Sequence, residues 1–354
     1  NYGEQSGEKS GELSNFDLKP HEKGQLVFPA NDWNRDEKLH IQFLQYDTLM
    51  VDEYHIQLGE KEMYLPELSK GSLVAEEDEK KISITGKAYS VDINKGTGLL
   101  ENLQVNHEVI IQSGPYVNFR VPGKNVQYST IQMEDYARDW KLDKLDYSVE
   151  DGIAHIQVEG AYDKVSANFS IELDENGVFI IDYQIDGIPE DKYIQEAGIK
   201  FITGNNFEKL AWDRDAYFTA YPTDDLGMPA GEVDLAQIPT MSYRQKPQHT
   251  WDMDAQGFYY FGLEVKLPYA NMVRSLKENI YSYSLLTAGS KLEVRSTGTQ
   301  ACRFDKIDGN NTLIINDLWD YTSLLWGNYY KKILSEGELH NGKVVFSGAS
   351  HTTN

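Results

Sequence analysis

The residues best suited to chemistry lie in one acidic and aromatic stretch, LAWDRDAYFTAYPTDDLG, which runs from Leu210 to Gly227. Sugars present C–H faces that stack on indole and phenol rings, and their hydroxyls bond to carboxylate and guanidinium groups. We therefore predict carbohydrate contacts from Trp212, Arg214, Tyr217 and Tyr221. The alternative for each ring is a place in the core, because aromatic side chains carry a large apolar area.

A second aromatic cluster, NDLWDYTSLLWGNYY, supplies Trp319 and Trp326 as further carbohydrate-binding candidates. Asp213 and Asp215 stand two residues apart and would share one face of a strand. Glycoside hydrolysis needs two carboxylates that face each other across a sugar. With 56 acidic residues in the chain, such a pair is easily found by chance. An exposed acidic strand edge near Arg214 is the preferred interpretation.

Motifs for nucleophilic, metal and cofactor chemistry are missing from the sequence. NKGTGLL lacks the third glycine of a dinucleotide fingerprint, and no Gly-x-Ser-x-Gly elbow is present. DMDAQG begins like a calcium loop, but Leu263 stands where the bidentate glutamate is needed. DKIDGNN, from Asp305 to Asn311, is interpreted as an oxygen-rich turn, with bound calcium as the less favoured alternative. We predict no catalytic residue, no metal and no cofactor in this chain.

Composition excludes two classes of partner. The formal net charge of -23 would repel nucleic acid and anionic lipid. No apolar run approaches the roughly 20 residues that a membrane-spanning helix needs. The single cysteine, Cys302, excludes an intramolecular disulfide, and 23 tyrosines in a turn-rich chain are typical of extracellular β-proteins. We expect a secreted or periplasmic protein.

Short strand patterns separated by turns dominate the sequence. KISITG, YSVDIN, EVIIQSG, AHIQVEGAY and VFIIDYQID alternate or run apolar, and DENG before the last of them is a strong hairpin signal. These patterns predict an all-β fold rather than an α/β fold. Leu210 and Trp212 alternate, so one face of their strand should be buried. The segment Asn271 to Leu286 fits a helix or a strand, and both alternatives stay open.

A change in composition predicts two domains. The polar and charged stretch LPELSKGSLVAEEDEK interrupts the strand pattern and places a boundary near residue 75. Residues 1–75 then form a smaller unit that starts with a flexible segment of Gly, Ser and Glu. Residues 76–354 form the larger β-domain.

Taken in order, these segments resemble the carboxy-terminal region of the β-galactosidase type of glycoside hydrolase family 2. ELSNFDLKPHEKGQLVFP and LHIQFLQYDTLMVDEYHIQLGE resemble strands of the last immunoglobulin-like domain in those enzymes. YSVDINKGTGLLENLQVNHEVIIQSGPYVNFRVPGKN resembles the opening of their terminal β-sandwich, with Thr97-Gly98, Gly114-Pro115 and the Asn-Phe-Arg-x-Pro motif from Asn118 to Pro122. YARDWKLDKLDYSVEDG and AGIKFITGNNFEKLAWDRDAYFTAYPTDDLG continue the match.

The resemblance implies a partial immunoglobulin-like sandwich over residues 1–75. It implies a large antiparallel super-sandwich of galactose-mutarotase type, similar to the small chain of β-galactosidases, over residues 76–354. In the family both catalytic glutamates lie in an upstream TIM barrel, and this sequence begins inside the immunoglobulin-like domain. The implied partners are a galactoside-containing glycan and the upstream catalytic barrel of the same polypeptide.

The match to the family has departures. Gly123, Lys124 and Asn125 replace an Asp-Asn-Asp run, and DRDAYFTA replaces a Gly-x-Gly-Pro element. Both departures put ordinary β-galactosidase specificity in doubt. Trp319 stands where the family's terminal domain sends a tryptophan toward the substrate.

The sequence leaves three functions open. The preferred one is a non-catalytic region of a glycosidase that shapes a carbohydrate subsite and packs against the catalytic domain. The second is an independent carbohydrate-active enzyme, a sugar epimerase or a polysaccharide lyase, with His249 as the nominated general base. The third is a stand-alone glycan-binding protein.

Overall fold

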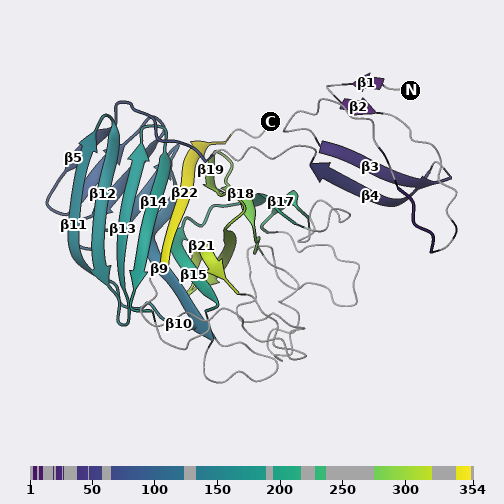
Figure 1. The fold of residues 1–354 in the computed structure, drawn as a ribbon. Coiled ribbons are helices and arrows are strands. Elements are labelled where there is room, and N and C mark those ends of the chain that lie inside the picture. Colours follow the sequence, from purple (N-terminus) through teal and green to yellow (C-terminus); the bar gives the residue numbers. More distant parts are fainter. Residues whose placement is uncertain are drawn as a thin grey trace. The chain divides into compact units, whose positions relative to one another are not determined.

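A computed structural model describes the chain over the residues 3–5, 8–10, 19, 21–25, 27, 38–46, 48–57, 65–122, 133–188, 194–216, 228–236, 275–320 and 340–351. Every regular element in these residues is a β-strand, and all strand pairs are antiparallel. Two large sheets form the main body (Figure 1). The all-β fold predicted from the sequence is confirmed.

The first large sheet has nine strands. Eight of them lie in the order β20 (Ala301–Ile307), β21 (Asn310–Trp319), β15 (Glu196–Thr203), β9 (Glu108–Pro122), β8 (Leu100–Val105), β7 (Tyr89–Asn94), β6 (Lys81–Thr85) and β5 (Val74–Glu77). The ninth, β10 (Met133–Asp135), pairs with β9. Strands β5 to β9 follow the chain, whereas β15, β20 and β21 arrive from much later in the sequence.

The second large sheet also has nine strands. Their order is β11 (Lys141–Glu150), β12 (Ile153–Ala161), β13 (Ser166–Asp174), β14 (Val178–Asp186), β22 (His340–Ser350), β19 (Ser290–Arg295), β18 (Ile280–Leu286), β16 (Lys209–Arg214) and β17 (Ala230–Asp234). Strand β22 joins the meander β11–β14 to the later strands. In Figure 1 the teal arrows β12, β13 and β14 and the yellow arrow β22 lie side by side in this sheet.

The hydrophobic core fills the space between the two sheets. Strand β7 alternates buried and partly exposed residues along YSVDIN, and β14 does so along VFIIDYQID, as strands with one buried face must. Phe179 of β14 stacks on Phe346 of β22 with 4.7 Å between ring centroids. Phe201 of β15 packs edge-on against Phe346 at 5.3 Å, so this ring cluster joins the two sheets.

Local turn and strand signals are confirmed where the structure describes them. The DENG turn links β13 and β14, and its Gly177 has a positive φ of 81° that glycine adopts freely. The alternation of Leu210 and Trp212 holds, because both side chains are buried in β16. Of the ambiguous segment, Ile280–Leu286 is strand β18, and residues 271–274 lie outside the described residues.

The small elements near the amino terminus form two separate hairpins. Strands β1 (Gly3–Gln5) and β2 (Glu8–Ser10) pair, and β3 (Lys38–Gln45) pairs with β4 (Leu49–Gln57). The chain divides into two compact units, Asn1–Leu39 with Ile56–Glu62 and His40–His55 with Met63–Asn354. The domain boundary near residue 75 and the immunoglobulin-like assignment stay predictions.

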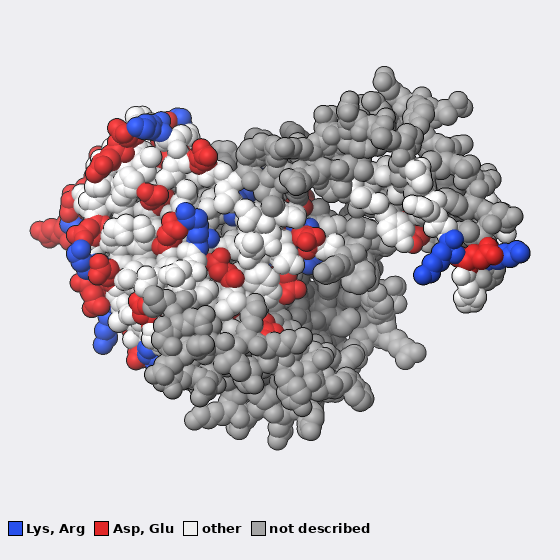
Figure 2. All heavy atoms as spheres, in the orientation of Figure 1, with Lys and Arg blue, Asp and Glu red and all other residues white. Residues whose placement is uncertain are grey.

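The described surface carries mixed charge. On the face shown in Figure 2, acidic side chains are spread over the large β-unit with basic side chains among them. The described residues of that face form no single basic patch. None of the described segments is a helix of the length and hydropathy needed to cross a membrane.

Candidate functional site

A group of polar and charged side chains is buried on one face of the first large sheet. Its members come from four adjacent strands, β9, β15, β21 and β20, and none is more than 7% exposed. We call this group the buried polar face; it consists of Asn118, Arg120, Glu196, Arg303, Asp305 and Asn316. Charged residues are rarely buried to this extent unless they are paired, so the group is the strongest candidate for a site in the described residues.

The strand register brings these residues to the same face. Glu196 of β15 lies opposite Arg120 on one side and opposite Trp319 on the other. In the next row, Gly198 lies between Asn118 and Asn316. Side chains alternate along a strand, so members of these two rows point the same way. A register shift between Ala197 and Gly198 keeps Trp319 in line with Glu196.

Arg303 joins the strands of the buried polar face through its guanidinium group. Its Nε donates to Glu196 Oε1 at 2.7 Å, and its Nη2 donates to Glu196 Oε2 at 3.0 Å. Its Nη1 donates to Asp305 Oδ2 at 2.6 Å. The two-pronged contact with Glu196 is the strong geometry for an arginine and a carboxylate.

Two asparagines meet across β15 because the residue between them is glycine. Asn118 Nδ2 donates to Asn316 Oδ1 at 2.9 Å and to Glu196 Oε2 at 3.0 Å. A Cβ at Gly198 would lie 2.0 Å from the carbonyl oxygen of Ile315, which is far inside contact distance. Any side chain at this position would therefore collide with the neighbouring strand and separate the two amides.

Glu196 is held in its ionised form. Burial opposes its charge, but Arg303, followed by Arg120 and Asn118, outweighs burial and lowers the pKa of Glu196 to about 2. A group with such a pKa does not donate or accept a proton near neutral pH. Glu196 is suited to accepting hydrogen bonds and holding neighbours in place, and it is unsuited to acid–base catalysis.

Among the described residues, the charges of the buried polar face and of the neighbouring pair Lys200–Asp135 are equal in number. Lys200 lies on the same face of β15 as Glu196, and its Nζ pairs with Asp135 Oδ2 of β10 at 2.8 Å. Together with the buried polar face this makes three cationic side chains and three carboxylates: Arg120, Lys200 and Arg303 against Asp135, Glu196 and Asp305. A balanced set does not call for a charged ligand, and it presents donors and acceptors that suit a neutral polar ligand.

One buried acceptor of this group has no hydrogen-bond donor. Asn118 is 0% exposed, and its Oδ1 accepts no hydrogen bond from any described residue. Buried polar atoms are almost always hydrogen-bonded, and leaving an acceptor unpaired costs about 1–3 kcal/mol. A ligand hydroxyl or an ordered water is the natural donor for this atom.

Three of the residues predicted from the sequence converge on the dipeptide Lys277–Glu278. Trp319 Nε1 donates to Glu278 Oε1 at 2.7 Å. Lys277 Nζ lies 4.5 Å from the centre of the Trp212 ring, in a cation–π contact. Burial lowers the pKa of Arg214, and the negative charge of Glu278 opposes that shift. The dipeptide also pairs with β20 through Lys277 and Cys302, next to Arg303.

The exposure of these predicted residues differs. Trp212 is 3% exposed and is part of the core, and its Nε1 donates to the carbonyl oxygen of Met228 at 3.0 Å. Trp319 and Arg214 are only partly buried, so part of each side chain is accessible. Tyr217, Tyr221, Trp326 and the nominated base His249 lie outside the described residues. The carbohydrate-binding roles of all these residues stay predictions.

The residues of the buried polar face were missed by sequence reasoning. A usable signal was present: charged or amide side chains two residues apart in otherwise apolar strands. Asn118 and Arg120 show it in YVNFRVP, and Arg303 and Asp305 show it in ACRFDKI. Inside a half-buried strand such residues lie on one face together. No sequence pattern indicated that these strands would be neighbours.

A second polar cluster joins the two sheets on the inner side of β21. Tyr183 of β14 donates to Asp317 Oδ2 at 2.6 Å and lies 3.2 Å from His340 Nε2. Gln300 Nε2 donates to Asp317 Oδ1 at 2.8 Å. Burial raises the pKa of Asp317 and raises that of Tyr183 well above its ordinary value. Through the hydrogen bond that the Tyr183 hydroxyl donates to Asp317, this cluster acts as a polar connection between β14, β22 and β21.

The fold and site together define an all-β protein of two large antiparallel sheets with a charge-balanced polar site on one of them. Similar solved structures include the galactosidase domain of an α-galactosidase-sucrose kinase, at 10% identity and a TM-score of 0.38, with 79% of this chain and 42% of that chain covered. An α-mannosidase from Enterococcus faecalis V583 is 9% identical with a TM-score of 0.47, and 89% of this chain and 36% of that chain are covered.

A smaller similar structure is the galactose 1-epimerase from Lactobacillus acidophilus NCFM, at 11% identity and a TM-score of 0.40, with 79% of this chain and 98% of that chain covered. The chain thus spans less than half the length of the first two structures and nearly all of the epimerase. No protein-family model and no curated protein matches the sequence.

Proposed function

We propose that this chain is a non-catalytic carboxy-terminal region of a β-galactosidase-like glycoside hydrolase, and that it contributes one wall of a carbohydrate subsite. The supporting observation is the buried polar face: it pairs buried arginines with buried carboxylates and holds an unpaired acceptor, Asn118 Oδ1, and its Glu196 lies opposite Trp319, whose indole is partly accessible. The ligand of this site is a neutral sugar of a galactoside-containing glycan.

Trp319 is the stacking partner in this proposal. Its indole nitrogen is fixed by Glu278, which sets the plane of the ring. Its neighbour across the ladder, Glu196, stays ionised and accepts hydrogen bonds. An aromatic face next to fixed acceptors is the arrangement that sugars use, because it meets both the C–H face and the hydroxyls.

A binding role fits this site better than catalysis. Hydrolysis or epimerisation needs a group whose pKa lies near the working pH. Glu196 is too acidic for that task, and Tyr183 is too weak an acid. The catalytic acid and nucleophile come, in this proposal, from a barrel that precedes this region in the same polypeptide, as the sequence resemblance implies. A secreted or periplasmic location belongs to the same proposal.

A fluorescence titration of the 354-residue chain with methyl β-galactoside and lactose tests the proposal. We expect a saturable change in tryptophan emission, which Trp319→Ala abolishes. Trp140→Phe is the matched control, because Trp140 is also partly buried but donates to Thr97 on another part of the fold. Equal binding by wild type and Trp319→Ala would contradict the proposed subsite.

Turnover measurements on the same chain separate binding from catalysis. We expect no hydrolysis of a nitrophenyl β-galactoside and no change in the rate at which galactose anomers interconvert, followed by polarimetry. Activity in either assay that survives rigorous purification would instead support the independent-enzyme alternative.

A further inference from the structure

The segment that precedes β5 is fastened to the large β-unit by two acidic side chains. We call residues 69–72 the strap. The backbone N–H and the hydroxyl of Ser69 donate to Asp174 Oδ2 at 2.9 and 2.7 Å. The N–H and hydroxyl of Ser72 donate to Glu175 Oε2 at 2.8 and 3.2 Å. Gly71 N–H donates to the carbonyl oxygen of Asp151 at 3.2 Å.

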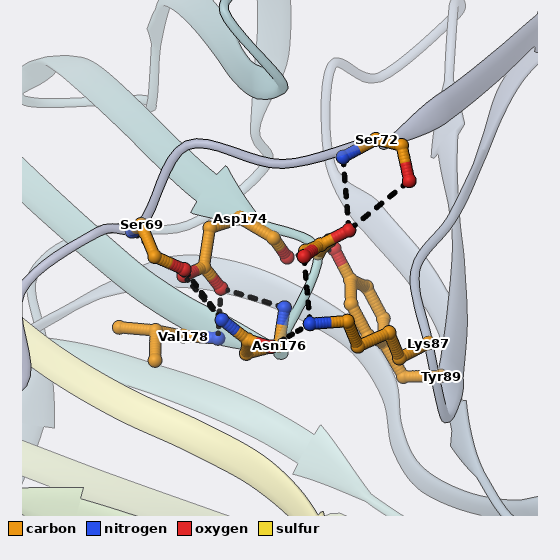
Figure 3. A network of polar contacts seen from close by, with 8 residues as sticks. Ser69, Ser72, Lys87, Tyr89, Asp174, Asn176 and Val178 are labelled. Atoms are coloured by element: carbon orange, nitrogen blue, oxygen red, sulfur yellow. Dashed lines mark hydrogen bonds and ion pairs between the residues drawn. The ribbon is translucent and has the colours of Figure 1, made fainter.

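These anchors belong to the DENG turn between β13 and β14 (Figure 3). Asp174 is 0% exposed and organises the turn, because its Oδ1 accepts from the N–H groups of Asn176 at 2.9 Å and Val178 at 3.1 Å. Tyr89 supports it from β7 by donating to the Asp174 carbonyl oxygen at 2.7 Å. The strap therefore rests on a rigid support.

Asn176, like Glu175, contacts both the strap and Lys87 of the body. Its Nδ2 donates to Ser69 Oγ and, at 3.4 Å, to Asp174 Oδ2. Its Oδ1 accepts from Lys87 Nζ at 2.9 Å. Figure 3 shows Asn176 between Ser69 on one side and Lys87 on the other. The residue is nevertheless exposed to solvent, and it is followed by Gly177.

We propose that Asn176 is a deamidation site and that its conversion releases the strap irreversibly. In an Asn-Gly pair the backbone nitrogen of the glycine attacks the side-chain carbonyl carbon of the asparagine. The new N–Cγ bond closes a succinimide, the Cγ–Nδ2 bond breaks, and Nδ2 leaves as ammonia. Water then opens the ring and leaves aspartate or isoaspartate. A glycine offers no side chain to hinder the attack, and Gly177 already has a positive φ of 81°.

The closed strap restrains this reaction. The attack requires the side-chain carbonyl carbon of Asn176, Cγ, to turn toward the backbone nitrogen of Gly177. Hydrogen bonds to Ser69, Asp174 and Lys87 hold the side chain, and Gly177 N–H itself donates to the Asp174 carbonyl oxygen at 3.2 Å. When the strap opens, the Asn176 side chain loses its hydrogen bond to Ser69 and can turn. The rate of deamidation should therefore rise with the fraction of molecules in which the strap is open.

The product favours the open strap. A carboxylate at position 176 loses the donor to Ser69 and places a negative charge beside Asp174, whose Oδ2 lies 3.4 Å from the present Nδ2. Like charges at this distance repel, and a modification that adds negative charge next to an acid disrupts its surroundings. The contact with Lys87 survives and strengthens, because a cation now meets a carboxylate. The new carboxylate therefore weakens the contacts with the strap and keeps the contact with Lys87.

The chain holds a matched control for this chemistry. Asn341–Gly342 is the same dipeptide, but it lies in β22, where Asn341 pairs with Gln184 and Gly342 pairs with Tyr183. The extended ladder keeps both backbone positions fixed, and a Cβ at Gly342 would lie 2.3 Å from the Tyr183 hydroxyl oxygen. We expect this second site to resist deamidation.

Peptide mass mapping of the full chain after incubation at mildly alkaline pH measures the reaction at both sites. We expect conversion at Asn176 and none at Asn341. Ser69→Ala removes the two hydrogen bonds of the Ser69 hydroxyl, to Asp174 and from Asn176, and should accelerate conversion at Asn176 at least about fivefold. Ser170→Ala, on the exposed face of the same hairpin, should leave the rate unchanged. Equal conversion at the two asparagines, or a rate at Asn176 unaffected by Ser69→Ala, would overturn the proposal.

Trypsin cleavage after Lys70 measures the opening of the strap directly. Lys70 is exposed, but its peptide bond is held by the contacts of Ser69 and Gly71, so cleavage requires release. We expect Asn176→Asp, which mimics the product, to be cut after Lys70 about fivefold faster than wild type. Asn341→Asp adds the same charge elsewhere and should be cut at the wild-type rate. Equal cleavage of Asn176→Asp and Asn341→Asp would contradict the release step.

Discussion

Two buried carboxylates in this protein, Glu196 and Asp174, are stabilised in opposite ways. Both are 0% exposed. Glu196 is paired with the guanidinium of Arg303 inside a set of buried charges. Among the described residues, the Asp174 carboxylate accepts only from neutral donors: the N–H groups of Ser69, Asn176 and Val178 and the side chains of Ser69 and Asn176.

The difference separates a structural acid from the acid of a candidate site. The Oδ1 atom of Asp174 is satisfied within its own turn by donors two and four residues away, and its Oδ2 atom accepts from the neutral donors of Ser69, 105 residues away. Glu196 meets Arg303 across 107 residues of sequence, and its partner Asn118 retains an unsatisfied acceptor. Burying an ion pair brings little net stability, so the arrangement at Glu196 needs a reason beyond folding. The proposed carbohydrate subsite supplies that reason.

Removal of Glu196 should have the largest effect. Glu196→Ala removes one of the two buried carboxylates that Arg303 contacts and leaves two buried arginines, Arg303 and Arg120, with less opposing charge, and we expect a loss of about 3–5 kcal/mol in the free energy of unfolding. Urea unfolding followed by tryptophan fluorescence measures it. A loss below that of Asp174→Ala would break the distinction between the two acids.

The pH dependence of stability should also report on the Glu196–Arg303 pair. The folded-state pKa of Glu196, about 2, lies below its ordinary value of 4.5, so its ionised form stabilises the fold above pH 4.5. That contribution is lost as the pH falls from 4.5 through 2, and it amounts to about 3 kcal/mol at most. Unfolding measured across this window should be less pH-dependent in Glu196→Gln than in wild type. Identical slopes for the two proteins would show that Glu196 does not titrate as described.

Replacement of Asp174 should cost less. Asp174→Ala removes an acceptor from several N–H and hydroxyl groups but leaves no charge stranded, so we expect a loss of about 2 kcal/mol. Asp174→Asn should recover part of it, because its Oδ1 still accepts from the turn. Hydrogen exchange should show faster exchange at residues 69–72 in both variants. Unchanged exchange there would contradict the anchoring role of Asp174.

Removal of an exposed ion pair should change the free energy of unfolding least, and it gives the baseline for the two buried carboxylates. Asp182 pairs with Lys343 at 3.3 Å, and both side chains are more than half exposed. Asp182→Ala should change the free energy of unfolding by about 0–1 kcal/mol, since water screens such pairs. A loss well above 1 kcal/mol would contradict the screening of this exposed pair by water.

The sequence predicts the features that depend on residues close together along the chain, and it does not predict those that depend on which strands become neighbours. The strands, the DENG turn and the burial of Leu210 and Trp212 depend on neighbours in sequence, and these predictions are confirmed. The segment of residues 271–286 is ambiguous in sequence because its apolar residues fit a helical period loosely, whereas its Tyr-Ser-Tyr-Ser alternation fits a strand. Pairing with β16 and β19 makes Ile280–Leu286 a strand.

The candidate site depends on strand order, which the sequence does not display. Arg303 reaches Glu196 only because β20, β21, β15 and β9 are neighbours in one sheet. Sequence reasoning named Trp212, Arg214 and Trp319 for their side-chain types but missed Glu278 and Lys277, which bring them together. A lysine and a glutamate in a chain rich in both carry no signal until the fold places them.

The central claim is that a neutral sugar binds beside the buried polar face, and a crystal structure of the chain with a bound galactoside tests it most directly. We predict a sugar ring packed against the indole of Trp319. We also predict a hydroxyl that donates to Asn118 Oδ1, directly or through one water. A galactoside bound elsewhere on the molecule, with Trp319 and Asn118 untouched, would contradict the account.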